Sequence, residues 1–163
     1  METKLNHVRI FQQIPLDGLT RLAERGHPRA FPAGGILMRQ GERAEVMYVI
    51  LRGKVRVERH HPDLLDPVVL ADLGAGEVVG EMGLLDGQPR SATVTALDDT
   101  ETLEMDGADL AYTVLRYPEV SMALMQTISR RLRSLDELAA HMSIQSDRAG
   151  GRRRRRPFDE ADL

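Results

Sequence analysis

Short apolar runs separated by glycines fill the middle of this sequence and constrain its fold more than any other feature. The runs lie at residues 36–38, 46–51, 55–57, 68–73, 92–97 and 103–105. Several strands at short spacing with glycine turns are typical of a β-sandwich or a β-barrel. Val55 and Val57 alternate with polar neighbours, as residues of a half-buried strand do. The segment 29–106 is therefore predicted to be a β domain.

The longest periodic segment begins near Pro118 and runs to about Gln145. Its apolar residues are spaced as in a heptad seam: Met125, Ile128, Leu132, Leu135, Ala139 and Met142. Such a seam packs on its own barrel, as any amphipathic helix does, or joins two copies of the chain. Because the spacing is maintained through the whole segment, we predict a homodimer through the helix 118–145.

The changes of period divide the chain into four parts. We expect an N-terminal helical segment at 1–28, the β domain at 29–106, C-terminal helices at 107–146 and a disordered tail at 147–163. The tail holds five consecutive arginines and then three acidic residues. These arginines contact nucleic acid, an anionic membrane or an acidic partner, or they are simply solvated and partly neutralised by the acidic end. The composition favours the solvated tail.

Several classes of function are not expected. Without the tail charges, 17 basic and 22 acidic side chains remain, so the body is a poor partner for nucleic acid. The residues after Gln145 are too few for a helix-turn-helix domain, which argues against sequence-specific DNA binding. No apolar stretch approaches the roughly 20 residues of a membrane span, and no signal peptide is visible, so the expected location is the cytoplasm.

Catalytic and metal-binding signatures are also missing from the sequence. It contains no nucleophile elbow, zinc-binding His-Glu-x-x-His motif or Walker loop, so no enzyme is predicted. The chain has no cysteine, and the adjacent His60 and His61 are expected to face solvent in a hairpin turn rather than bind a metal.

The stretch 76–92, GEVVGEMGLLDGQPRSA, combines two features of an anion site. Gly80 begins a glycine-rich turn that leads into a short helix, where backbone N–H groups can point at an anion. Arg90 and Ser91 then return a guanidinium and a hydroxyl to the same place. Glu81 is a carboxylate in this site, which suits a ligand with a hydroxyl beside its phosphate, as in a ribose. Simpler roles are a helix-terminal acid for Glu81 and a surface ion pair for Arg90.

This stretch resembles the phosphate-binding cassette of the cyclic nucleotide-binding domain family, which includes the catabolite activator protein and protein kinase A regulatory subunits. The resemblance runs from about Phe11 to about Leu138. Outside the cassette it rests on FPAG at 31–34, QGE at 40–42, Tyr48, Ile50, GKV at 53–55 and ATV at 92–94. It implies a mainly β fold with some α structure. That fold is an eight-stranded β-roll of the jelly-roll type, flanked by N-terminal helices and a long C-terminal helix that caps the ligand.

The resemblance also implies roles for individual residues. Gly80 and Met82 would offer backbone N–H groups, with Gly83 in the same turn, Glu81 would bind the ribose 2′-hydroxyl, and Arg90 and Ser91 would bind the cyclic phosphate. The positions that line the nucleotide pocket correspond to Met38, Val57, Leu70 and Leu73. The residue that contacts the base varies in the family, and Arg133 and Ser134 are the candidates here.

The function implied is a receptor that couples ligand binding to movement of its C-terminal helix, with no cofactor and no bound metal. The ligand is cAMP or, alternatively, cGMP, because Ser91 can also hydrogen-bond a guanine. The other hypothesis is an interaction or dimerisation module that keeps the fold and no longer binds nucleotide. Loss of the arginine or the glutamate would mark such a module, and both Arg90 and Glu81 are present. The downstream protein stays open.

Overall fold

The computed structural model describes the backbone of residues 2–151 and the side chains of residues 4–142. It divides into two compact units, Met1–Gln126 and Thr127–Leu163. The strands are β1 (His27–Phe31), β2 (Ile36–Met38), β3 (Val46–Arg52), β4 (Lys54–Arg59), β5 (Val68–Gly74), β6 (Val78–Val79), β7 (Thr93–Ala96) and β8 (Thr100–Asp106). The helices are α1 (Glu2–Leu5), η1 (Arg9–Phe11, a 3-10 helix), α2 (Leu16–Arg25), α3 (Glu81–Asp86), α4 (Gly107–Arg116) and α5 (Glu119–Gly151).

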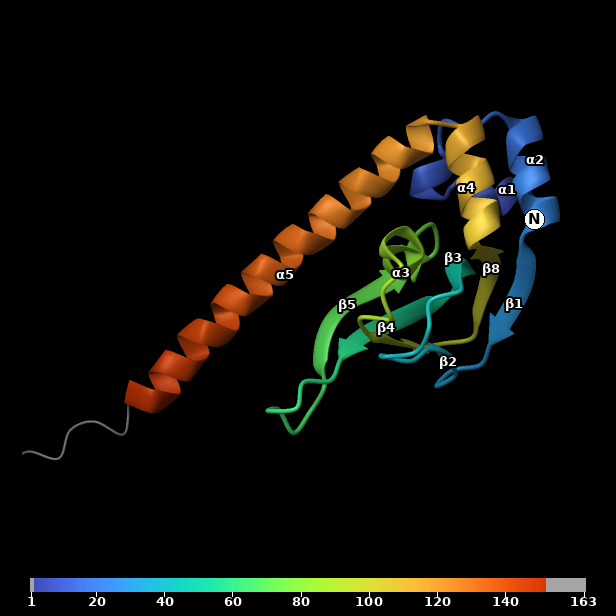
Figure 1. Ribbon diagram of the computed structural model, residues 1–163. Helices are drawn as coiled ribbons and strands as arrows, with labels where there is room; N and C mark the ends of the chain where they lie inside the picture. The colour runs from blue at the N-terminus through green and yellow to red at the C-terminus, as the bar shows by residue number, and fades with distance from the viewer. Residues whose placement is uncertain (1, 152–163) are drawn as a thin grey trace, which may run out of the picture. The chain divides into compact units, whose positions relative to one another are not determined.

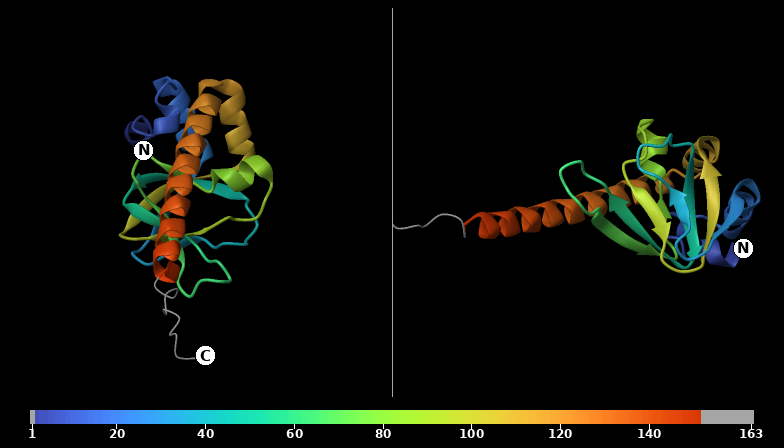
Figure 2. Two further views of the ribbon diagram at one scale, coloured as in Figure 1. Left: turned by 90° about the vertical axis from the view of Figure 1, so that its left-hand side faces the viewer. Right: turned by 90° about the horizontal axis from the view of Figure 1, so that it is seen from below.

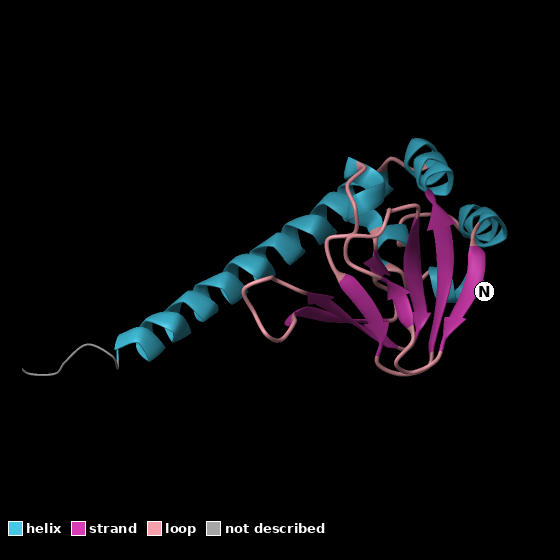
Figure 3. Ribbon diagram, turned by 60° about the horizontal axis from the view of Figure 1, so that its bottom comes forward, coloured by secondary structure: helices cyan, strands magenta, loops and turns pink. Residues whose placement is uncertain are grey.

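The eight described strands form two four-stranded antiparallel sheets. One sheet has the order β1-β8-β3-β6 and the other β2-β7-β4-β5. The strands gather into one roll from which the loop between β4 and β5 projects (Figure 3). This arrangement confirms the predicted eight-stranded β-roll with flanking helices.

The buried apolar residues of the roll form two clusters, and β3 contributes to both. Met47 and Val49 belong to the cluster formed with the helices, whereas Tyr48 and Ile50 belong to the cluster formed by both sheets. Successive side chains of a strand point to opposite faces, so one strand can join the two layers. The helices α1, α2 and α4 gather at one side of the strands (Figure 1). In both views of Figure 2, α3 lies apart from α1 and α2.

Charged contacts join the helices α2 and α4. Asp106 caps the N-terminus of α4 by accepting from the N–H of Asp109 at 2.8 Å, and the Asp109 carboxylate accepts from the Asp106 N–H in return. Asp109 also pairs with Arg25 of α2 at 3.0 Å, and the guanidinium of Arg25 lies 4.4 Å from the ring centroid of Tyr112. These contacts hold α2 against α4.

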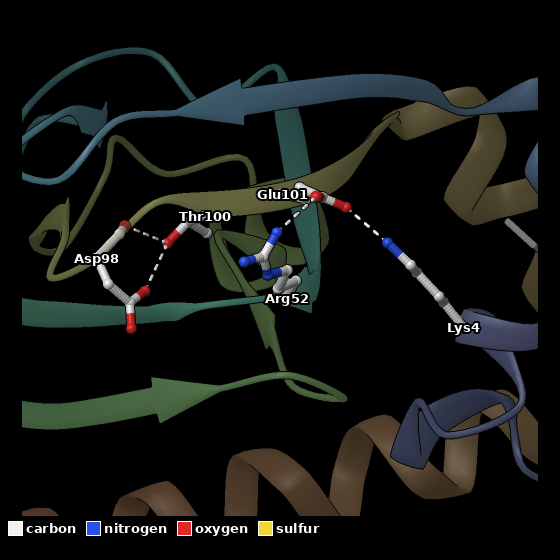
Figure 4. A network of polar contacts seen from close by, with 5 residues as sticks. All are labelled: Lys4, Arg52, Asp98, Thr100 and Glu101. Atoms are coloured by element: carbon white, nitrogen blue, oxygen red, sulfur yellow. Dashed lines mark hydrogen bonds and ion pairs between the residues drawn. The ribbon is translucent and has the colours of Figure 1, made fainter.

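A second polar network lies where α1 meets β8 and β3 (Figure 4). Lys4 donates to Glu101 at 2.6 Å and Arg52 donates to the same carboxylate at 3.4 Å. The hydrogen bond from Lys4 is the main cause that holds the pKa of Glu101 below its ordinary value. All three side chains are largely solvent-exposed, so these ion pairs contribute little to the stability of the fold.

The helix α5 extends farther than the sequence predicts. It continues to Gly151, past the end expected at residue 146, so residues 147–151 are helical rather than part of the tail. Glycine in a helix costs only about 1 kcal/mol relative to alanine, whereas proline costs about 3 kcal/mol, and the next proline is Pro157. The arginines at 152–156 lie outside the described residues. Over the described range, no helix combines the length and apolarity needed to cross a bilayer.

Candidate functional site

The predicted glycine-rich turn forms at the junction of β6 and α3. Gly80 adopts φ +81°, the left-handed region that glycine enters without a steric penalty, and it directly precedes α3. Gly87 ends the helix with φ +68°, and its N–H donates to the Gly83 carbonyl at 3.0 Å. The short helix is therefore bounded by two residues whose backbone conformation favours glycine.

The first turn of α3 places its residues in different surroundings. The side chain of Glu81 is only 1% exposed, whereas that of Met82 is exposed to solvent. Gly83 is buried because α3 approaches the loop between β2 and β3, and a Cβ at position 83 would collide with Ala44. The turn thus presents a buried carboxylate beside closely approaching backbone.

Arg90 lies against this turn. Its side chain is 7% exposed, and its Nη1 donates to the Gly80 carbonyl at 2.8 Å while Nη2 donates to the Val46 carbonyl. Within the described residues two of the five guanidinium N–H groups are used in this way, which leaves donors for an anion. Burial lowers the pKa of Arg90 from its ordinary value, and the nearby Tyr48, Glu42 and Glu81 oppose that shift.

The backbone on either side of Arg90 is also fixed. The N–H of Gly41 donates to the Arg90 carbonyl at 2.8 Å, and the N–H of Arg90 donates to the Glu42 carbonyl at 2.8 Å. The next residue, Ser91, is exposed. The β2–β3 loop therefore holds Arg90 through its main chain, while the side chain points to the start of α3.

The apolar residues predicted to line a pocket lie in the cluster between the sheets. Met38 and Leu73 are buried members of it, and Val57 packs against it half-buried. Met38 also reaches the turn, because a Cβ on Gly80 would lie 2.8 Å from the Met38 Cε. Leu70 is different. The register pairs Val57 with Ala71 and Glu58 with Val69, so Leu70 is the extra residue of a β-bulge in β5.

Arg133 and Ser134 lie on the second unit, Thr127–Leu163. Both are exposed, and the Ser134 hydroxyl donates to the Arg130 carbonyl one turn earlier at 3.2 Å. Their predicted contact with a base stays a prediction.

The sequence profile of the cyclic nucleotide-binding domain matches residues 28–117, which is more than half of the chain. The chain belongs to the cyclic nucleotide-binding domain family.

Individual relatives agree with this assignment. The cyclic AMP receptor protein of Thermus thermophilus is 39% identical over 108 residues, which cover 66% of this chain and 50% of that protein. A cyclic nucleotide-gated potassium channel of Rhizobium etli is 35% identical over 124 residues, which cover 76% of this chain and 33% of the channel. The CRP-like cAMP-activated global transcriptional regulator of Mycobacterium tuberculosis is 29% identical over 133 residues, covering 82% and 59%. The chain thus spans about a third to three fifths of the length of these relatives.

Solved structures show the same relationship. The catabolite activator protein of Thermus thermophilus superposes with a TM-score of 0.73 at 32% identity, covering 83% of this chain and 63% of that one. A cyclic nucleotide-binding domain from Methylobacillus flagellatus superposes with a TM-score of 0.72 at 26% identity, covering 85% and 80%. The family β-roll is therefore present over most of this chain.

Some contacts of the candidate site were not predicted from the sequence. The Val46 carbonyl and the main chain of Gly41 and Glu42 hold Arg90, although none of these residues was a candidate. The motif QGE at 40–42 was a signal for the loop, but it did not show which residue the loop contacts. A backbone carbonyl carries no side-chain signature, so the Val46 contact had no signal at all.

We expect Gly80→Ala to destabilise the domain more than Gly34→Ala. Both glycines have φ +81°, so both variants carry the same backbone strain of about 1–2 kcal/mol. A Cβ at position 80 would lie 2.7 Å from Arg90 Nη1, whereas one at position 34 meets no atom of the described chain within 4 Å. The Arg90 side chain would have to shift and weaken its hydrogen bond to the Gly80 carbonyl, which should add about 0.5–1.5 kcal/mol for Gly80→Ala, measured by urea denaturation. Equal losses for the two variants would show that Arg90 does not lie against Gly80.

Proposed function

We propose that this domain is a cyclic nucleotide receptor that performs no chemistry of its own, with cAMP as the first candidate ligand and cGMP as the second. The observation that carries the proposal is the buried Arg90 guanidinium beside the Gly80–Glu81 turn. The named relatives support the choice of ligand, since they include a cyclic AMP receptor protein and a cAMP-activated regulator.

The phosphate would bind at the open side of the Arg90 guanidinium. A guanidinium offers a planar pair of donors that matches two phosphate oxygens. The Ser91 hydroxyl, which is exposed, and the backbone N–H groups of Gly80, Met82 and Gly83 would complete the anion site. Burial of Arg90 strengthens its attraction for a phosphate, because the charge is poorly screened by water.

Glu81 would select the sugar. A carboxylate repels a phosphate but accepts a hydrogen bond from a hydroxyl, so its presence beside Arg90 favours a ligand that carries both groups. In cAMP the 2′-hydroxyl of the ribose is such a group. Because Glu81 is buried, water does not compete for its carboxylate, and this hydrogen bond would discriminate strongly between ligands with and without the hydroxyl.

The remaining ligand surface would be covered from two sides. Met38, Val57, Leu70 and Leu73 would contact the apolar faces of the nucleotide, and Arg133 or Ser134 of α5 would contact the base. A nucleotide that touches both the roll and α5 favours the arrangement in which it makes both contacts, by no more than its difference in affinity between the two states. We propose that residues 1–28 are an N-terminal helical segment, that residues 29–106 are the receptor, and that the helices from residue 107 to Gly151 respond to the ligand.

Calorimetric titration with cAMP, cGMP and 5′-AMP tests the receptor proposal. We expect cAMP to bind in the micromolar range or better and 5′-AMP far more weakly, since the turn encloses a singly charged cyclic phosphate. Arg90→Ala should weaken cAMP about a hundredfold because it removes two charge-assisted hydrogen bonds. Arg90→Lys should recover only part of the loss, because Lys is a point charge.

The control for this titration is Arg21→Ala, an exposed arginine on α2 whose loss should leave the affinity unchanged. Equal binding of cAMP and 5′-AMP would contradict a site for a cyclic phosphate. No binding of either cyclic nucleotide would favour the interaction module.

A second prediction separates Glu81 from Arg90. The wild type should prefer cAMP to 2′-deoxy-cAMP, whereas Glu81→Ala should bind the two about equally, because the acceptor for the hydroxyl is gone. Both affinities can be measured by competition against one fluorescent cAMP analogue. A Glu81→Ala protein that keeps the full preference for the 2′-hydroxyl would limit Glu81 to orienting Arg90 or capping α3.

The third prediction concerns the proposed homodimer through α5. Leu132 and Leu135 lie in the heptad seam and are solvent-exposed. If the seam is intermolecular, the wild type should show twice the 18.2 kDa chain mass in light scattering, and replacing both leucines by lysine should give a folded monomer. Leu115→Lys, an 83% exposed leucine of α4 outside the seam, is the matched control. A wild-type mass of one chain at high concentration would refute the dimer.

A further inference from the structure

The strand β7 pairs with β4 as far as Thr93, and β4 itself ends at Arg59. The register pairs Val55 with Ala96 and continues residue by residue until Glu58 pairs with Thr93. Continued by two residues, this register would place Ser91 opposite His60. The chain has already left the sheet there, since β7 begins at Thr93 and the preceding residues carry the anion site.

The backbone of His60 nonetheless faces the side on which β7 lies. At the other end of the same pairing, the Lys54 carbonyl accepts from the Leu97 N–H at 2.8 Å. In an antiparallel ladder every second residue presents its N–H and C=O to the same neighbour. Counting in twos from Lys54 reaches His60, so its N–H and C=O point to the position that Ser91 would occupy.

The side chain of Gln40 fills this position. Its Nε2 donates to the His60 carbonyl at 3.0 Å, and its Oε1 accepts from the His60 N–H at 2.7 Å. A side-chain amide that both donates to and accepts from one residue reproduces the hydrogen bonds of a paired strand residue. The Gln40 backbone N–H also donates to the Thr93 hydroxyl at 3.0 Å, so the residue spans the first residue of β7.

We propose that Gln40 is a positioning residue for the anion site: its amide takes the place that Ser91 would have opposite His60, the residue after β4, and thereby ends the β4–β7 ladder at Thr93. The chain before Thr93 is then available to turn toward α3. Directly after Gln40, the main chain of Gly41 and Glu42 holds Arg90 through two hydrogen bonds of 2.8 Å each. One short segment therefore blocks the sheet position and fixes the arginine in the cassette.

If the role of Gln40 were purely structural, its loss would have a different effect. If Gln40 only fastened its loop to the β4–β5 hairpin, its loss would loosen the loop and leave the end of β7 where it is. If Gln40 competes with Ser91, its loss should let β7 grow by two residues, because the N–H and C=O of His60 are then open to pairing with Ser91. Arg90 and Ser91 would then be drawn out of the site.

The experiment compares Gln40→Ala with the wild type by NMR in the ligand-free protein and by cAMP titration. We expect cross-strand nuclear Overhauser contacts between His60 and Ser91 to appear only in Gln40→Ala, together with cAMP binding that is weaker by about tenfold. Gln40→Glu keeps the acceptor for the His60 N–H and loses the donor to its carbonyl, so both effects should be intermediate. Gln13→Ala, an exposed glutamine in the N-terminal segment, should match the wild type.

The outcomes decide the proposal in either direction. Absence of His60–Ser91 contacts in Gln40→Ala overturns it, whether or not the affinity falls, and contacts without a loss of affinity overturn the positioning role. The affinity arm rests on the proposed function, but the NMR arm does not. A wild type that binds no cyclic nucleotide would refute the receptor, while the length of β7 in Gln40→Ala would still test Gln40. If Gln40→Ala does not fold, Gln40→Glu supplies the same two measurements.

Discussion

The burial of one positive charge is the constraint on which the rest of the site depends. Taking a guanidinium out of water is costly unless its N–H groups find acceptors, and Arg90 finds two of them in backbone carbonyls rather than in side chains. Those carbonyls belong to Gly80, after β6, and Val46, at the start of β3. Both strands lie in the same sheet, so the pairing of β3 with β6 brings the two acceptors together. The site is built on strand ends because only the sheet can hold the carbonyls at fixed positions.

The two apolar layers of the roll contact the anion site at different points. The layer that β3 shares with the helices contains Met47 and Val49, and Leu84 of α3 packs against it. The layer between the sheets ends at Met38, which reaches the turn before α3. A change in the inner layer can therefore reach the anion site through Met38, and a change in the layer shared with the helices can reach it through Leu84 of α3.

The cassette joins residues of opposite charge in a poorly solvated place. Glu81 and Arg90 are both buried, and the carboxylate is one of the groups that oppose the lowering of the Arg90 pKa. Opposite charges side by side reduce the net charge of the site, which makes it a poor trap for phosphate alone. A ligand that pairs a phosphate with a hydroxyl satisfies both groups at once, and this is the physical basis of the selectivity that we propose.

The sequence by itself determined the kind of fold and predicted the cassette residues that the structure brings together. Glycine spacing and short apolar runs indicated the strands, and Gly80, Glu81 and Arg90 were found from residue type and separation, because a left-handed turn and a buried charge each restrict the residues that fit. The tertiary structure decided the rest. The bulge at Leu70 depends on the register of two strands, and the hydrogen bonds of Gln40 with His60 depend on the loop after β2 lying beside the end of β4. Every residue has a backbone carbonyl, so the role of the Val46 carbonyl leaves no mark in the sequence. Such contacts arise from the placement of distant segments, which local sequence patterns do not encode.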